Sequence, residues 1–166
     1  MIRAVAASLV FFVTACGTTA SPDRASEPAS TSPAGEPAQP GAPEELAVGT
    51  LPGQRLTSGE CGLFLFTPRP SPRFVFFAAA STGVGRMVLN DREMTLARTS
   101  VDGDIVDQHY TEQAYQSAED ISLKLSLIPG RRTDTGFEIS NGSLRVDRAD
   151  GWTVVLPVSG STHCAG

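Results

Sequence analysis

The chain is poor in the residues that build metal sites. It has two histidines, His109 and His163, and three cysteines, and it contains neither a His-Glu-x-x-His motif nor paired Cys-x-x-Cys motifs. A structural zinc site takes four ligands, and a catalytic one takes three ligands plus water. His163 adjoins Cys164, but we expect that cysteine to be in a disulfide. The sequence therefore predicts no bound metal.

The usual motifs for phosphate binding and nucleophilic catalysis are also missing. Gly83-Val84-Gly85 lacks the third glycine and the following helix of a dinucleotide-binding loop, and no Gly-x-Ser-x-Gly elbow occurs. Paired carboxylates can serve a glycosidase, but the acidic residues that lie close in sequence flank turns, where such side chains are usually solvated. These residues are Asp102, Asp104, Asp107, Glu112, Glu119 and Asp120. We predict a non-catalytic protein without a cofactor and keep a periplasmic hydrolase as the lesser alternative.

Positive charge is scarce. Arginine and lysine together number 13 against 18 acidic residues, which gives a net charge of −5, and only one of the 13 is lysine. The only basic doublet, Arg131-Arg132, follows Gly130 and is expected in a solvated loop. Nucleic acids and anionic lipid headgroups attract proteins through concentrated positive charge. We therefore expect neither to be a partner.

The amino-terminal apolar run is too short for a membrane-spanning helix, which needs about 20 residues. It follows Arg3 and covers residues 4–15, AVAASLVFFVTA. A positive residue, a short apolar run and small residues at its end are typical of a secretory signal peptide. We predict that residues 1–15 are a signal peptide.

The end of this run resembles the lipobox of bacterial lipoproteins. Val13-Thr14-Ala15-Cys16 looks like the motif that lipoprotein signal peptidase cuts just before the modified cysteine. The resemblance implies acyl chains such as palmitate on Cys16, and two chains anchor a protein stably to a membrane. Gly17 stands where an aspartate retains enterobacterial lipoproteins on the inner membrane. We therefore expect a cell-envelope protein that faces the periplasm, with the outer membrane favoured.

Lipid on Cys16 leaves an even pair of cysteines, Cys61 and Cys164. Disulfides form in oxidising compartments such as the periplasm. The two cysteines lie 103 positions apart, and closing so long a loop stabilises a fold by up to ~4.7 kcal/mol in the chain-entropy model. We predict a Cys61–Cys164 disulfide.

A proline-rich segment follows the lipobox. Between residues 17 and 45 the chain has six prolines, many serines, alanines and glycines, and no large apolar side chain. Such a segment buries too little apolar surface to offset its ordering entropy. We predict that residues 16–47 are a disordered, lipid-anchored linker and that residues 48–166 form the folded domain.

The rest of the chain consists of short apolar or alternating runs separated by turn residues, and none of them has a helical period. In residues 121–128, for example, every second side chain is apolar, as in a half-buried strand. The predicted strands are 62–67, 73–79, 86–90, 94–100, 105–115, 121–128, 137–140, 144–148 and 152–158. This spacing predicts an all-β fold, an antiparallel eight- or nine-stranded sandwich or small barrel.

Two Asx-Gly pairs predict hairpin turns. Asn141-Gly142 suits a two-residue type I′ turn and would pair Ile139 with Leu144. Asp102-Gly103 is expected to make another hairpin, although its apolar neighbours do not select one register.

A three-residue loop, Ala149-Asp150-Gly151, predicts a further hairpin, with its glycine at the left-handed position. This hairpin would pair Val146 with Val154. It also places Arg148 opposite Trp152, close enough for a cation–π contact at the rim of the sheet.

Binding is the expected function. Five of the eight phenylalanines lie between Phe64 and Phe77, which predicts strands packed on both faces; the alternative is a barrel cavity that carries a hydrophobic ligand. Trp152, Arg148 and Tyr110 are the predicted surface anchors for a protein or an envelope polymer. Lipobox, linker and disulfide-closed β domain together are similar to small uncharacterised lipoproteins of Gram-negative bacteria. They are also loosely like the lipoprotein inhibitors of c-type lysozyme, which are small β-barrels.

Overall fold

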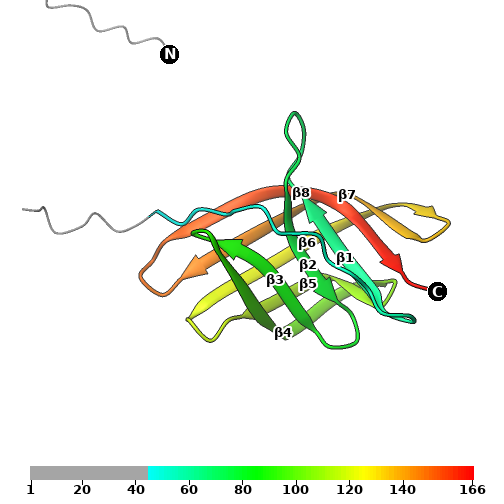
Figure 1. Cartoon of the computed structure of the whole chain (residues 1–166), viewed down its shortest axis with the longest axis horizontal. Coiled ribbons are helices and arrows are strands. Elements are labelled where there is room, and N and C mark those ends of the chain that lie inside the picture. The colour runs from blue at the N-terminus through cyan, green and yellow to red at the C-terminus, as the bar shows by residue number, and fades with distance from the viewer. Residues whose placement is uncertain (1–44) are drawn as a thin grey trace, which may run out of the picture. The chain divides into compact units, whose positions relative to one another are not determined.

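Residues 45–166, which the computed structural model describes, form a closed barrel of eight antiparallel strands in which each strand pairs with its neighbour in sequence (Figure 1). The predicted signal peptide, the lipidation at Cys16 and nearly all of the predicted linker lie outside these residues. The strands are β1 (Cys61–Phe66), β2 (Phe74–Ala79), β3 (Val84–Leu89), β4 (Arg92–Val106), β5 (His109–Gln116), β6 (Ile121–Thr133), β7 (Gly136–Arg148) and β8 (Thr153–Cys164). The prediction of an all-β fold is confirmed, and the architecture is a barrel.

Pairing of the first and last strands closes the barrel. β1 and β8 run antiparallel over six residue pairs, from Cys61 opposite Cys164 to Phe66 opposite Ser159. The two cysteines form a disulfide with a Cα–Cα distance of 4.0 Å. The predicted disulfide is thus present, and it joins the two ends of the barrel sequence directly across the closing seam.

Apolar side chains fill the interior. All eight strands contribute to one buried cluster, and β6 contributes four residues at every second position, as its alternating sequence predicts. Phe76 is fully buried there and packs edge-on against Tyr115, with ring centroids 5.3 Å apart. At about 25 cal/mol per Å² of apolar surface removed from water, this packing is the main force that holds the strands together.

The end of the barrel near the disulfide contains polar side chains. Tyr115 donates a hydrogen bond to Gln113 Oε1 at 2.6 Å. The turn between β4 and β5 bends toward the closing seam, because Thr162 Oγ1 donates to the Asp107 carboxylate at 2.5 Å and the Gln108 amide lies 3.3 Å from Cys61 Sγ. This turn therefore links the middle of the chain to its two closing strands.

The predicted turn at Asn141-Gly142 is wrong, because both residues lie within β7. Ile139 and Leu144 are both buried although they lie five positions apart, a spacing that a regular strand would send to opposite faces. Bulges in the pairing of β7 with both of its neighbours restore the alignment. A Cβ on Gly142 would lie 2.7 Å from the carbonyl oxygen of Ser126, so this glycine permits a close strand approach.

The predicted turn at Asp102-Gly103 is also wrong. Gly103 has a φ of 77° but lies inside β4, where the pairing with β5 is irregular. The chain reverses at Asp107 and Gln108, whose φ angles of 45° and 68° are those of a type I′ turn built without glycine. The predicted strand 105–115 is therefore divided between β4 and β5.

The third predicted hairpin is confirmed. Val146 pairs with Val154 in β7 and β8, and the amide of Arg148 donates to the carbonyl of Trp152 at 2.9 Å. Gly151 has a φ of 94°, in the left-handed region. β8 continues well past the predicted end of this strand, to Cys164.

The chain before β1 packs against the barrel. β2 and β3 pair over only three residue pairs, and residues 46–51 lie where these strands separate. Val48 bridges to Leu89, Gly49 N donates to Val88 O, and Leu51 N donates to Phe74 O at 2.7 Å. Leu46, which the sequence assigned to the linker, is 6% exposed and belongs to the core. Within the described residues, no helix has the length and apolarity needed to cross a membrane.

Candidate functional site

The three predicted surface anchors do not come together. Tyr110 lies near the start of β5, beside the disulfide end, and pairs with Ile105, which is 64% exposed. Arg148 and Trp152 lie at the opposite end of the barrel, at the turn between β7 and β8. The sequence therefore predicted two separate surfaces and no single site.

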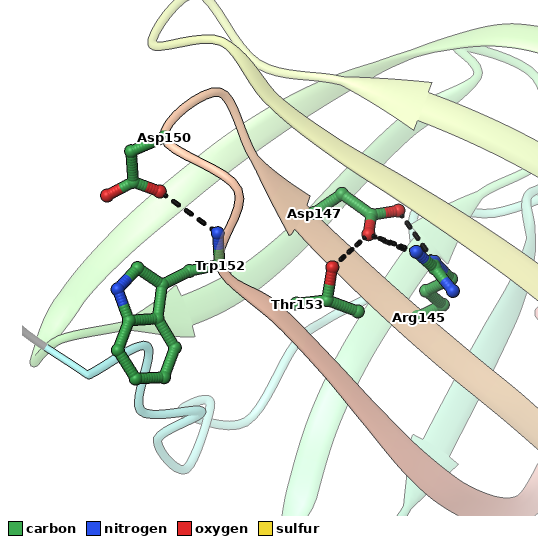
Figure 2. Close-up of polar contacts among 5 residues, drawn as sticks. All are labelled: Arg145, Asp147, Asp150, Trp152 and Thr153. Carbon is green, nitrogen blue, oxygen red and sulfur yellow. Dashed lines mark hydrogen bonds and ion pairs between the residues drawn. The ribbon is translucent and has the colours of Figure 1, made fainter.

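Local hydrogen bonds and an ion pair stabilise the turn between β7 and β8, where Trp152 lies. The Asp150 carboxylate accepts the amide of Trp152 at 3.2 Å and forms an ion pair with Arg148 at 2.6 Å. Next to this turn, Asp147 accepts hydrogen bonds from Arg145 and Thr153, and these lower the pKa of its carboxyl. The indole points away from the Asp147 cluster (Figure 2).

A second aromatic cluster lies on the outer face of β1 and β2. Phe64 alternates with the buried Leu63 and Leu65, so it points outward. Its ring stacks on Phe74 with centroids 5.9 Å apart and tilts against Phe77 at 5.1 Å. The prediction that these strands pack on both faces is thus confirmed, since the inner face meets the core and the outer face carries this cluster.

A recess, here called the outer groove, lies beside that cluster. Residues 53–57 form one side, and outward-facing residues of β2, β3 and β4 form the other. Its volume of about 520 Å³ is within the range of ligand sites. The apolar part of its lining is Leu56, Phe77, Ala79 and Val84.

Three of the four charged residues of the outer groove have polar partners within the described part of the chain. Arg86 lies 3.7 Å from Glu93, and its Nη1 donates to Gln54 Oε1 at 3.4 Å. The Glu60 carboxylate accepts a short hydrogen bond from the Ser81 hydroxyl and a second hydrogen bond from the backbone amide of Ser81. These bonds lower the pKa of Glu60, so this carboxylate stays ionised. A general acid at neutral pH needs the opposite shift.

Arg55 differs from these residues. It is exposed, lines the outer groove and forms no ion pair or hydrogen bond with the other residues from 45 to 166. The backbone amides and carbonyls of residues 53–56 also form no backbone hydrogen bonds in that part of the chain. One side of the groove therefore offers a free guanidinium and a row of free peptide groups.

A smaller recess of about 190 Å³ opens at the other end of the barrel. Its apolar residues are Leu46, Leu89, Met94 and Ile121. The ion pair between Arg92 and Glu119, 3.2 Å long, lies on its rim, together with Arg148. Within residues 45–166, no three His, Cys, Asp or Glu side chains are placed to hold a metal ion.

Comparison with known proteins gives no relative: no family model, no curated protein and no solved structure matches this chain. Function is therefore inferred from the residues and recesses of the barrel itself.

The outer groove is not evident from the sequence, because residues 53–57 have no strand pattern. One signal pointed toward it. The outer face of β1 and β2, which does not contribute to the barrel core, carries four phenylalanines: Phe64, Phe66, Phe74 and Phe77. An apolar outer face requires a cover, and residues 51–56 supply part of it, since a Cβ on Gly62 would meet Leu56 Cδ2 at 2.7 Å.

Proposed function

We propose that this chain is a lipid-anchored protein of the bacterial cell envelope whose β-barrel binds a protein or envelope polymer on its outer face. The observation that carries the proposal is that the recess lies outside the barrel and that the interior is filled. Apolar side chains from all eight strands fill the interior, whereas the groove of about 520 Å³ lies outside the barrel wall. The lipobox at Cys16 supports the envelope location.

A carrier that holds its ligand inside the barrel is the less favoured alternative, because such a ligand would have to replace core side chains such as Phe76 and Leu123. The recess at the Arg148 end, at about 190 Å³, is large enough for one side chain or a short acyl segment. A hydrolase is supported less well, since Glu60 and Glu93 in the outer groove are bound to Ser81 and Arg86.

Membrane attachment is tested by fractionation of cells that carry the natural chain or Cys16→Ser. We expect the natural chain in the membrane fraction and the variant, still folded, in the soluble fraction. Attachment that persists in Cys16→Ser would contradict the lipid anchor.

Binding is tested by photo-crosslinking in intact cells, with a benzophenone amino acid at Gln54 in the outer groove. The matched control carries the same probe at Ala118, which is exposed in the turn between β5 and β6. We expect a discrete crosslinked species from Gln54 and none from Ala118. Equal labelling from both positions, or none from either, would contradict a specific binding groove.

A further inference from the structure

We propose that the outer groove binds an extended peptide segment of a partner protein that carries an acidic residue next to an apolar one. This inference rests on the proposed function and specifies the class of partner. Three features carry it: free peptide groups along one side, apolar side chains along the groove and one unpaired cation.

The free peptide groups are those of Gly53, Gln54, Arg55 and Leu56. Their amides and carbonyls form no backbone hydrogen bonds within residues 45–166. The chain is anchored on both sides of this stretch, by Leu51 N to Phe74 O at 2.7 Å and by Gly59 N to Ala165 O at 2.8 Å. In β-strand addition an extended peptide pairs with the free peptide groups of a sheet edge; residues 53–56 offer free peptide groups of the same kind, on a segment that is not itself a strand.

The apolar lining supplies the second feature. Phe77 is 6% exposed and its ring packs against Phe64, so it is fixed in position. Ala79 and Val84 pair with each other across β2 and β3 and face outward beside it. These small side chains leave space for an apolar side chain of an incoming peptide. In an extended peptide, every second residue would face this lining.

Charge complementarity supplies the third feature. The Glu60 carboxylate accepts hydrogen bonds from Ser81, and Arg86 lies 3.7 Å from Glu93, so each of these charged groups already has a polar partner within the molecule. Arg55 on the same side of the groove has no such partner among the described residues. A ligand carboxylate would give the Arg55 guanidinium the partner it lacks, and a cationic group at the same place would meet a like charge.

The inference is tested with a phage-displayed library of random octapeptides selected against the full chain carrying Cys16→Ser. We expect the selected peptides to share an Asp or Glu close to an apolar residue. On binding, the amide resonances of Gln54 and Val84 should shift, whereas that of Ala118 should not. Selected peptides that bind elsewhere, or a selection that yields no binder, would overturn the inference.

A charge reversal in the protein and N-methylation of the peptide then test the cation and the backbone separately. Arg55→Glu should weaken binding of a selected peptide about tenfold, because charge reversal replaces an attraction by a repulsion. Arg69→Glu makes the same charge change in the exposed loop between β1 and β2 and should leave binding unchanged. N-methylation of alternate amides in the peptide should also weaken binding at least tenfold. Equal affinity for Arg55→Glu and Arg69→Glu would contradict the assigned cation.

The Gln54 crosslink in cells separates this inference from the proposed function. A crosslinked species that protease degrades and lysozyme leaves intact supports a peptide partner. A crosslinked species that lysozyme degrades, and that stays attached to a polymer after protease treatment, would show a polymer partner. It would overturn the peptide inference but not the proposed binding to an envelope component. Absence of any crosslink from Gln54 would overturn both.

Discussion

His109 is the most unusual single residue in the barrel. Its side chain is 1% exposed, and neither ring nitrogen has a hydrogen bond of good geometry. Burial lowers its pKa to about 4; the backbone of Cys61 opposes this effect, the Arg98 guanidinium adds to it, and Glu60 and Asp107 oppose it more weakly. The neutral imidazole is thus the form that the folded protein holds.

Acid should therefore destabilise the protein through His109. The unfolded chain binds this proton near pH 6.5 and the folded chain only near pH 4, so stability falls as the pH drops through that interval. From pH 7 to pH 5 the loss from this residue is about 2 kcal/mol. Urea unfolding at the two pH values should show that His109→Leu removes most of this loss. His163→Gln, at an exposed histidine, should retain it; equal losses in the two variants would contradict the assignment.

Gly85 is a second residue that the packing fixes. A Cβ there would lie 2.9 Å from Phe76 Cζ and 3.1 Å from Tyr115 Cδ1 inside the core. Gly85→Ala should therefore lower the free energy of unfolding by about 1–3 kcal/mol, the usual cost of overpacking. Gly53→Ala is the matched control, since its Cβ would meet nothing within 4 Å. Thermal unfolding of both variants checks the expectation, and a stable Gly85→Ala would refute it.

At the scale of elements, the strands were more predictable than the turns that join them. Alternation in β6 and the glycine of the turn between β7 and β8 are local signals, and both identified their elements correctly. Asn141-Gly142 and Asp102-Gly103 predict turns, because Asx-Gly is a strong hairpin signal. Both instead lie within strands at irregular pairing. A bulge depends on the neighbouring strands, so the sequence of one strand does not distinguish it from a turn.

The turn between β3 and β4 offers a test at this scale. Asn90 and Asp91 have φ angles of 47° and 60°, which residues other than glycine adopt at a cost. Asn90 is left unchanged in this test, because its side-chain oxygen accepts a hydrogen bond from the amide of Ala47 at 2.8 Å. Asp91→Gly should raise the free energy of unfolding by about 0.5–1 kcal/mol, and Asp91→Val should lower it. Urea unfolding measures both variants. If Asp91→Gly and Asp91→Val changed the free energy of unfolding in the same direction, the turn geometry would be contradicted.

At the scale of the whole molecule, the sequence predicted the class of fold but left sandwich and barrel open. Periodicity shows which residues face a core, whereas closure depends on whether the first and last strands meet. Only the prediction of a bond between Cys61 and Cys164 pointed to that meeting. The outer groove was equally hidden, because it is formed by residues 53–57 lying against strands from later in the chain.

The disulfide should contribute strongly to stability. It closes a loop of 103 positions, so the double variant Cys61→Ala/Cys164→Ala should lose roughly 2–4 kcal/mol of unfolding free energy. A reducing agent should lower the urea midpoint of the natural chain toward that of the double variant. The double variant itself should be insensitive to the reductant, and an unchanged midpoint for the natural chain would contradict this contribution.

Closure between β1 and β8 has a consequence for local motion. In an open sheet the two outer strands each have one unpaired edge and fray before the centre does. In this ring every strand has two hydrogen-bonded neighbours, so neither the first nor the last strand has a free edge. Amide hydrogens of β1 and β8 should therefore exchange with solvent as slowly as those of β5. A ring of this kind has no free outer strand at which fraying starts; its shortest strand pairing is that of β2 with β3, over three residue pairs.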